Sequence, residues 1–237
     1  MRLVGSLLFI FILESFAGKF TTSNERAESI TNFYTEDQYI EMVYHLVSED
    51  HSSLPYDLFS KGMKGYNILR KKGVLKNDRY LTLIDYSLES TAKRLWLIDL
   101  ENDTVVYNIR VAHGKNTGQN RPLHFSNRPT SRKSSLGFYL TGKTYYGKHG
   151  LSLYLDGLEK GINDKARERY IVIHAANYVS PDFIQKVGRL GRSYGCTDVN
   201  PCYAKDLIQR IKDKSLLFIY HPTEQYTEKS NLVSNWE

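Results

Sequence analysis

Two segments near the N-terminus carry apolar residues at the spacing of an amphipathic helix. Thr35 and Gln38 form a capping-box pattern, and the apolar residues after them recur at helical intervals: Tyr39, Ile40, Val43, Leu46 and Val47. A second helix is expected to begin at Pro55 and to end in a basic turn before Gly73. Since no flexible linker follows, we expect residues 27–76 to form a helical cap packed on the main domain; a separate module is the alternative.

After residue 76 the pattern changes to short apolar and β-branched runs, which are typical of strands. We expect strands at Tyr80–Tyr86, Arg94–Leu100, Thr104–Val111, Gly137–Thr141, Leu151–Leu155, Tyr170–His174 and Leu216–Tyr220. Two short helices are expected after Ser180 and Asn200, because each of these capping residues precedes a proline. Many short strands with few helices predict a β-rich α+β domain over residues 77–227.

The stretch from residue 114 to 135 is polar and rich in Asn, Arg, Ser and Pro. A loop of this length in a compact domain is often a lid or a binding loop. A plain surface excursion explains the same composition, and the sequence leaves both readings open.

Both ends of the chain have distinct patterns. Met1 and Arg2 precede an apolar run too short to span a bilayer, and Ser15-Phe16-Ala17 follows as a small-x-small cleavage pattern. Residues 1–17 are therefore interpreted as a signal peptide, which predicts an exported, soluble protein of the periplasm or cell wall without stable membrane insertion. Residues 228–237 are expected to form a disordered tail.

The composition excludes little. The 237 residues include 32 Lys and Arg against 26 Asp and Glu, a net charge of +6, and 18 tyrosines. An exported basic protein meets little nucleic acid but does meet the anionic polymers of a bacterial wall, so no nucleic-acid partner is expected. A solvated surface of mixed charge accounts for the same balance. The oligomeric state is not indicated.

The two cysteines provide the first candidate chemistry. Cys196 lies in a glycine-flanked turn, and His174 ends an apolar strand about two dozen residues earlier. Cysteine is a useful nucleophile as the thiolate, and a nearby imidazole is its usual activator. The alternative is a structural disulfide between Cys196 and Cys202, which is the default for an even number of cysteines in an exported chain. The residues alone leave these two readings nearly even.

A series of segments in order resembles the YkuD-type murein L,D-transpeptidases of bacterial cell walls. The segments that carry the resemblance are Val111–Gly114, Ser126-Asn127, Ser134–Tyr139, Gly147–Gly150, Gly157–Asn163 and Gly188–Cys196, with the strand ending at His174 before the last of them. The resemblance runs from the first predicted helix to Tyr226, and it implies the mixed β-sheet core of that family.

The resemblance also implies roles for residues of the site. Cys196 becomes the nucleophile and His174 the general base, with the imidazole oriented by the backbone carbonyl of Ala175. The N–H groups of Gly195 and Cys196 are expected to form an oxyanion hole, and Ser193 to support the turn before the nucleophile.

Substrate binding is expected to involve Arg192, Tyr194 and Ala175. A guanidinium binds a carboxylate through two hydrogen bonds, and Arg189 is a further candidate for this role. Many relatives carry an arginine two residues after the nucleophile, whereas this chain has Asp198 there. An acidic residue at that position would repel a substrate carboxylate, so Arg192 is expected to take over the charge role.

The remaining candidate groups give no further site. His113, His149 and His221 show no metal-ligand spacing, and the chain has no C-x-x-C motif. We therefore expect no metal and no organic cofactor, and no nucleotide motif is present. Tyr178 and Phe183, at the start of a predicted helix, are expected to be core residues.

These inferences together predict an exported L,D-transpeptidase that acts on peptidoglycan stem peptides through a thioester on Cys196. The enzyme would form 3→3 cross-links or attach another amine acceptor. One alternative is an L,D-carboxypeptidase, in which water resolves the same thioester. Another is a non-catalytic wall-binding protein with a permanent Cys196–Cys202 disulfide.

Overall fold

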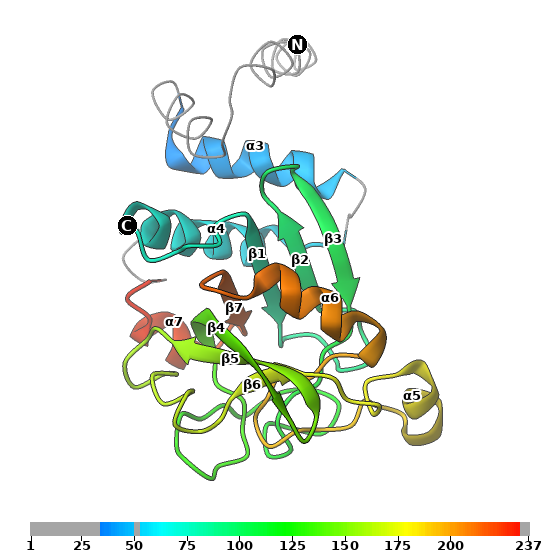
Figure 1. The fold of residues 1–237 in the computed structure, drawn as a ribbon. Coiled ribbons are helices and arrows are strands. Elements are labelled where there is room, and N and C mark those ends of the chain that lie inside the picture. The colour runs from blue at the N-terminus through cyan, green and yellow to red at the C-terminus, as the bar shows by residue number, and fades with distance from the viewer. Residues whose placement is uncertain (1–33, 50–52, 233–237) are drawn as a thin grey trace.

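A computed structural model describes residues 34–49 and 53–232 of the chain, and Figure 1 shows its arrangement. The predicted signal peptide lies outside the described residues. In chain order the elements are α3 (Glu36–Ser48), α4 (Tyr56–Lys71), β1 (Tyr80–Asp85), β2 (Leu95–Asp99), β3 (Thr104–Ile109), β4 (Gly137–Gly147), β5 (Gly150–Gly157), β6 (Val172–His174), α5 (Pro181–Val187), α6 (Pro201–Ile211), β7 (Leu216–Tyr220) and α7 (Glu224–Lys229).

The strands form one mixed sheet in the order β3-β2-β1-β7-β4-β5-β6. Neighbouring strands are antiparallel except β1 and β7, which pair in parallel with Leu83 opposite Phe218. β1 and β2 are buried along their whole length, as expected of strands covered on both faces. The β-rich α+β fold class predicted from the sequence is confirmed. The edge strand β6 ends at His174.

Helices α4 and α6 cover opposite faces of the sheet (Figure 1). Gly62 of α4 lies directly against Leu83, and Gly65 lies against the ring of Phe138, so the helix backbone approaches the sheet closely. On the other face, Arg210 of α6 donates to the hydroxyl of Tyr80. Because side chains alternate along a strand, Leu83 and Tyr80 of β1 point to opposite faces.

Part of the helical segment expected as a cap packs directly on the sheet. α4 forms one layer of the core, with Phe59, Met63 and Tyr66 buried. The reason is its apolar stripe, which is complementary to the buried face of β1, β7 and β4. Helix α3 packs outside α4 and against β3. Both predicted helix starts are confirmed: Thr35 and Gln38 make the reciprocal capping-box hydrogen bonds, and α4 follows Pro55 directly.

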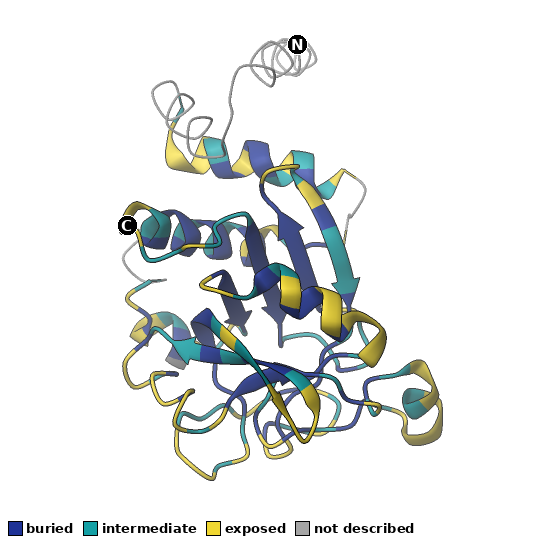
Figure 2. Cartoon of the chain, viewed as in Figure 1, coloured by how far each residue is buried: buried dark blue, intermediate teal, exposed yellow. Residues whose placement is uncertain are grey.

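Strand positions agree with the sequence pattern except around the β4–β5 hairpin. β4 continues to Gly147 and β5 begins at Gly150, well beyond the expected Gly137–Thr141 and Leu151–Leu155. The outer half of this hairpin is largely exposed, so hydrophobic alternation does not mark it. Figure 2 shows this exposed half in yellow beside the buried strands of the sheet. The tip of the hairpin carries His149.

The disordered tail predicted from Glu228 is wrong for residues 228–232. Glu228 and Lys229 belong to α7, and Ser230 is buried with its hydroxyl donating to the carboxylate of Glu159. Glu159 also accepts from Tyr226 and from the backbone N–H of Phe138. This buried carboxylate holds helix α7 and Ser230 against the sheet domain through contacts between residues 67 and 71 positions apart, which no local pattern indicates.

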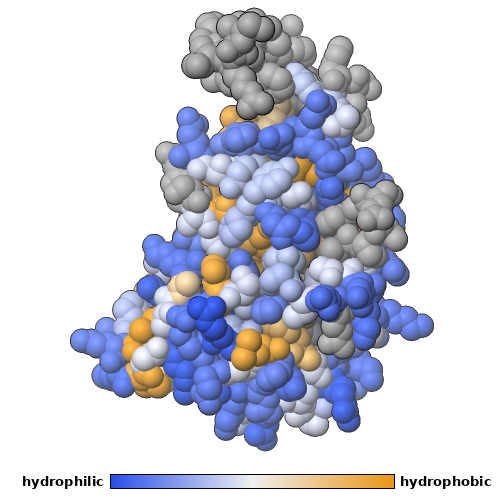
Figure 3. All heavy atoms as spheres, turned by 180° about the vertical axis from the view of Figure 1, so that it is seen from behind, coloured by the Kyte–Doolittle hydropathy of each residue, from blue (hydrophilic) through white to orange (hydrophobic). Residues whose placement is uncertain are grey.

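The surface seen from behind is mainly hydrophilic, with hydrophobic side chains in separate small patches (Figure 3). No helix within the described residues has both the length and the apolar character needed to cross a membrane.

Candidate active site

His174 and Cys196 are brought together by a short strand-like pairing beside β6. The N–H of Thr197 donates to the carbonyl of Val172, and the N–H of Val199 donates to the carbonyl of His174. Residues 197–199 therefore run parallel to the end of β6. Side chains alternate in such a segment, so Cys196 and Asp198 point to the same side, toward His174.

The turn before Cys196 is closed by the hydroxyl of Ser193. This oxygen accepts a hydrogen bond from the N–H of Gly195 (3.0 Å) and donates to the carbonyl of Cys196 (2.8 Å). The Gly195 N–H is therefore engaged, and the expected oxyanion hole made of both N–H groups is wrong in that part. The N–H of Cys196 has no acceptor among the described residues, so it is the donor of the pair that stays available.

A buried arginine braces the backbone that carries this turn. Arg94 donates to the carbonyls of Leu88 and Val111 and to Nδ1 of His113 (2.9 Å). His113 in turn accepts the N–H of Ser193 on its backbone carbonyl. Burial and the neighbouring guanidinium lower the pKa of His113 to about 3, so its ring is neutral. His113 is thus a structural residue beneath the site.

The side chains of Cys196, His174 and Asp198 form a compact group. Their sulfur, ring nitrogen and carboxylate oxygen lie within 4.8 Å of one another. Nδ1 of His174 lies 2.9 Å from the carbonyl oxygen of Ala175, and because a carbonyl only accepts, Nδ1 carries a proton. Nε2 lies 3.0 Å from Oδ1 of Asp198. The backbone contact to Ala175 is the one that the family resemblance implied.

The electrostatics of this group favour a charged imidazole. Burial lowers the pKa of His174, but the hydrogen bonds with Asp198 and Cys196 and the charge of Asp198 outweigh burial and raise it to about 10. Asp198 is fully buried, and its other oxygen accepts from the hydroxyl of Tyr178. Burial and the charge of Asp198 raise the pKa of Tyr178, which stays protonated.

Two expectations from the sequence are corrected here. Asp198 does not face the substrate and so does not repel a carboxylate; it points inward to His174. Tyr178 is not a plain core residue, because it donates to Asp198 and lines the cleft. The available signal was the spacing of Cys196 and Asp198, two residues apart in an extended segment, which places both side chains on one face. Phe183 also lines the cleft and makes an edge contact with Tyr178.

A cleft of about 750 Å³ opens over the cysteine. Its basic lining residues are Lys115, Lys148, His149, Arg169, Arg189 and Arg192, and Tyr145, Tyr170 and Tyr194 line it as well. The ring of His149, at the hairpin tip, stacks on His174 with 4.3 Å between centroids. The structure therefore brings Ser193, Arg192 and Tyr194 to the same cleft as Cys196 and His174. Ala175 meets the site through its carbonyl.

The arginines differ in how firmly they are held. Arg192 donates to the carbonyls of Lys115 and Gly118, and Arg189 donates to the carbonyl of Leu190. Arg169, which the sequence analysis did not single out, is half-buried and binds the carbonyls of Ser126 and Lys133. Burial lowers the pKa of Arg169. None of the described residues that line the cleft is acidic.

Both cysteines are free thiols, so the expected alternative of a Cys196–Cys202 disulfide is not present in this structure. Cys196 is half-buried in the cleft, whereas Cys202 is exposed in the first turn of α6. The sulfur of Cys196 also lies 3.5 Å from the carbonyl oxygen of Tyr170.

The group of Cys196, His174 and Asp198 contains the donor types of a metal site. Tetrahedral zinc with bonds of about 2.0–2.1 Å keeps its ligand atoms about 3.3 Å apart. The 3.0 Å between His174 Nε2 and Asp198 Oδ1 is shorter and fits a proton between the two atoms. The geometry therefore suits proton transfer better than ion binding.

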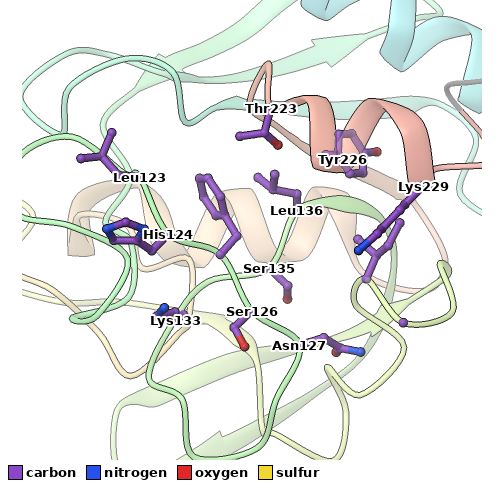
Figure 4. Close-up of a pocket in the computed structure, with 13 residues that line it drawn as sticks. Leu123, His124, Ser126, Asn127, Lys133, Ser135, Leu136, Thr223, Tyr226 and Lys229 are labelled. Atoms are coloured by element: carbon purple, nitrogen blue, oxygen red, sulfur yellow. The ribbon is translucent and has the colours of Figure 1, made fainter.

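A second cavity of about 360 Å³ lies between the segment from Leu123 to Leu136 and helix α7. Figure 4 shows its walls, with Lys133 and Asn127 on one side and Tyr226 and Lys229 on the other. None of the residues of the expected site lines this cavity.

Solved structures to which the chain is similar include several L,D-transpeptidases. An L,D-transpeptidase from Mycobacterium smegmatis is 11% identical, with a TM-score of 0.37 over 60% of this chain and 59% of the other. The helical cell shape determining protein Pgp2 from Campylobacter jejuni is 14% identical, with a TM-score of 0.40 over 69% of this chain and 57% of the other. The chain thus spans less than two thirds of each of these proteins.

No curated protein is significantly similar to the chain in sequence. The model of the L,D-transpeptidase catalytic domain, however, matches residues 50–220. That range contains α4, the whole sheet and the cleft with Cys196 and His174. With this match over more than half of its length, the chain belongs to the family of L,D-transpeptidase catalytic domains.

Proposed function

We propose that this protein is an exported cysteine acyltransferase of the L,D-transpeptidase type, which acts on peptidoglycan stem peptides. The observation that carries the proposal is the placement of a free thiol, Cys196, beside the oriented imidazole of His174 in an open cleft. Cysteine acyl transfer requires this pair within proton-transfer reach. Export through residues 1–17 is part of the proposal, since stem peptides lie outside the cytoplasm.

The charge of the cleft supports an acidic substrate. Lys115, Lys148, Arg169, Arg189 and Arg192 surround the thiol, and none of them makes a salt bridge within the described residues. Like charges gathered without acidic partners repel one another, so an anionic ligand is favoured. Stem peptides carry several carboxylates. In this proposal Arg192 and Arg189, which line the cleft, bind one of these carboxylates, with Tyr194 beside them.

The first half of the reaction forms a thioester on Cys196. The thiolate attacks the carbonyl carbon of the third stem residue, and the N–H of Cys196 donates to the developing oxyanion. The bond to the terminal D-alanine then breaks, and the imidazolium of His174 protonates the departing amine. Ala175 keeps the ring oriented through Nδ1, so that Nε2 faces the reacting atoms.

The second half of the reaction depends on the acceptor. An amine from a neighbouring stem attacks the thioester, His174 takes its proton, and the thiol of Cys196 is restored, which yields a 3→3 cross-link. Another amine gives an attached acceptor, and water gives an L,D-carboxypeptidase. The cleft is open, so amines and water all have access to the thioester. The products distinguish these acceptors.

The test compares the reduced wild type, Cys196→Ala and Cys202→Ala, each incubated with purified stem tetrapeptides and followed by mass spectrometry. Wild type and Cys202→Ala are expected to release D-alanine, and Cys196→Ala is expected to be inactive, because Cys202 lies exposed on α6. A 3→3 dimer identifies the transpeptidase and a free tripeptide the carboxypeptidase. Turnover by Cys196→Ala, or none by wild type with a titratable thiol, would contradict the proposal.

A further inference from the structure

The carboxylate of Asp198 lies on the reactive nitrogen of the imidazole. It approaches Nε2 of His174 to 3.0 Å, while Nδ1 is occupied by the carbonyl of Ala175. Nε2 is also the nitrogen left to exchange a proton with Cys196, because Nδ1 is held by Ala175. A ring nitrogen of His174, the sulfur of Cys196 and a carboxylate oxygen of Asp198 lie within 4.8 Å of one another. The acid is therefore a direct neighbour of the reacting groups.

The carboxylate of Asp198 has few partners besides His174. The side chain is fully buried, its Oδ2 accepts from Tyr178, and Oδ1 has no hydrogen-bond donor among the described residues apart from the imidazole. A buried carboxylate without a cation is strongly unfavourable. The positively charged form of His174 is the cation that this carboxylate faces.

A neutral imidazole does not suit this geometry. With the Nδ1 proton held by Ala175, the lone pair of Nε2 would face a carboxylate oxygen, and two acceptors would meet without a proton between them. When the S–H bond of Cys196 breaks and its proton moves to Nε2, an N–H bond forms toward Asp198, and the electron pair remains on sulfur. The carboxylate thereby favours the thiolate–imidazolium pair over the neutral thiol and imidazole.

We infer that Asp198 is a positioning residue that keeps the proton of Cys196 on His174, so that the nucleophile is a thiolate before substrate binds. This role rests on the proposed function for its purpose, but it concerns the free enzyme. The hydroxyl of Tyr178 donates to the other oxygen of the same carboxylate.

Other charged groups also face the imidazole, and their influence on the pKa of His174 must be distinguished from that of Asp198. His149 stacks on the ring from the tip of the β4–β5 hairpin, with Lys148 beside it, and Cys196 faces it from the turn. His149 is exposed, and burial together with the charge of His174 lowers its pKa. A His149→Gln background removes the second titrating ring and keeps the resonances of His174 unambiguous.

The test follows the titration of the His174 ring by NMR in the full-length protein with Asp198→Asn and, as the matched control, Tyr178→Phe. Asn has the shape of Asp and can still accept from Tyr178, so the charge alone is lost. We expect the pKa of His174 to fall by about 1–3 pH units in Asp198→Asn, the size of the effect of a close opposite charge. In Tyr178→Phe the charge remains, so the pKa should not fall.

A second readout measures the proton on sulfur. The ultraviolet absorbance of the thiolate, taken against Cys196→Ala at neutral pH, should be present in the wild type and reduced in Asp198→Asn. Neither readout requires a stem peptide, so failure of the proposed substrate would leave this result standing. An unchanged pKa of His174 in Asp198→Asn, or an equal fall in Tyr178→Phe, would overturn the inference.

Discussion

At the level of single residues, the turn before Cys196 depends on the absence of a side chain at Gly195. Its φ is 128°, which L side chains rarely adopt, and a Cβ there would lie 2.8 Å from Cδ1 of Ile171 and 3.0 Å from the carbonyl oxygen of Lys133. Gly188 also has a left-handed backbone, with φ 75°, but a Cβ added there would have no neighbouring atom within 4 Å. Comparing the two glycines therefore distinguishes the cost of the backbone conformation from the cost of steric contacts of an added Cβ.

Gly195→Ala is expected to reduce both stability and turnover. Gly188→Ala should cost about 1–2 kcal/mol from its left-handed backbone alone, whereas Gly195→Ala should add about 1–3 kcal/mol of overpacking. The shift of the turn should also misplace Cys196 and lower kcat. Denaturant unfolding and turnover of both variants check this. Equal stability losses, or full activity in Gly195→Ala, would show that the turn can relax.

At the level of elements, the site is assembled from backbone pairings that join distant segments. Residues 197–199 lie between the end of β6 and Val111-Ala112, with Val199 bridging to both Ala175 and Val111. Arg94, just before β2, holds the other side of that backbone through three carbonyl hydrogen bonds and lies over the ring of Tyr86. A buried charge therefore fixes the backbone that supports the turn of Cys196.

Arg94→Met is expected to destabilise the protein by about 3–5 kcal/mol, because the buried carbonyls of Leu88 and Val111 lose their donor. Arg121→Met is the control, since Arg121 makes only an exposed ion pair with Glu89 and should cost less than about 1 kcal/mol. Chemical denaturation of both variants measures the difference. Similar small losses for the two would mean that water or a rearranged backbone replaces the guanidinium.

At the level of the whole molecule, a sheet between α4 and α6 supports a site built at its edge. The buried polar groups under that site make global stability depend on pH. His113 is neutral in the fold, because Nδ1 accepts from Arg94 and burial opposes a second positive charge. Its pKa of about 3 lies below the ordinary value of 6.5.

Acid should therefore destabilise the fold through His113. Above about pH 6.5 His113 is neutral in both the folded and the unfolded protein. Between about pH 6.5 and 3 the unfolded protein binds a proton at His113 and the folded protein does not, so stability falls with pH in this window. Each pH unit in that window should lower the free energy of unfolding by at most about 1.4 kcal/mol. His113→Gln keeps an acceptor for Arg94 without the titration, so its stability should fall less steeply between pH 6.5 and 4. Parallel curves for the two proteins would exclude His113 as the cause.

Local pattern predicted the elements well because each depends on nearby residues. The capping box at Thr35, the proline after Asn200 and the continuous apolar run of Leu216–Tyr220 each act within one or two turns or one strand. The sequence pattern did not predict the exposed half of the β4–β5 hairpin or helix α7, since neither has a clear apolar periodicity. Glu159 fixes Ser230 across 71 positions.

The sequence by itself determined the family, the fold class and the pair Cys196 and His174, because these are carried by residue types in order along the chain. Only the tertiary structure decided the surroundings of that pair: that Asp198 turns inward to His174, that Ser193 occupies the Gly195 N–H, and that Tyr178 belongs to the cleft. The physical reason is that hydrogen bonds and charge interactions act over a few ångströms in space. The residues that make them here come from segments that only the folded backbone brings together.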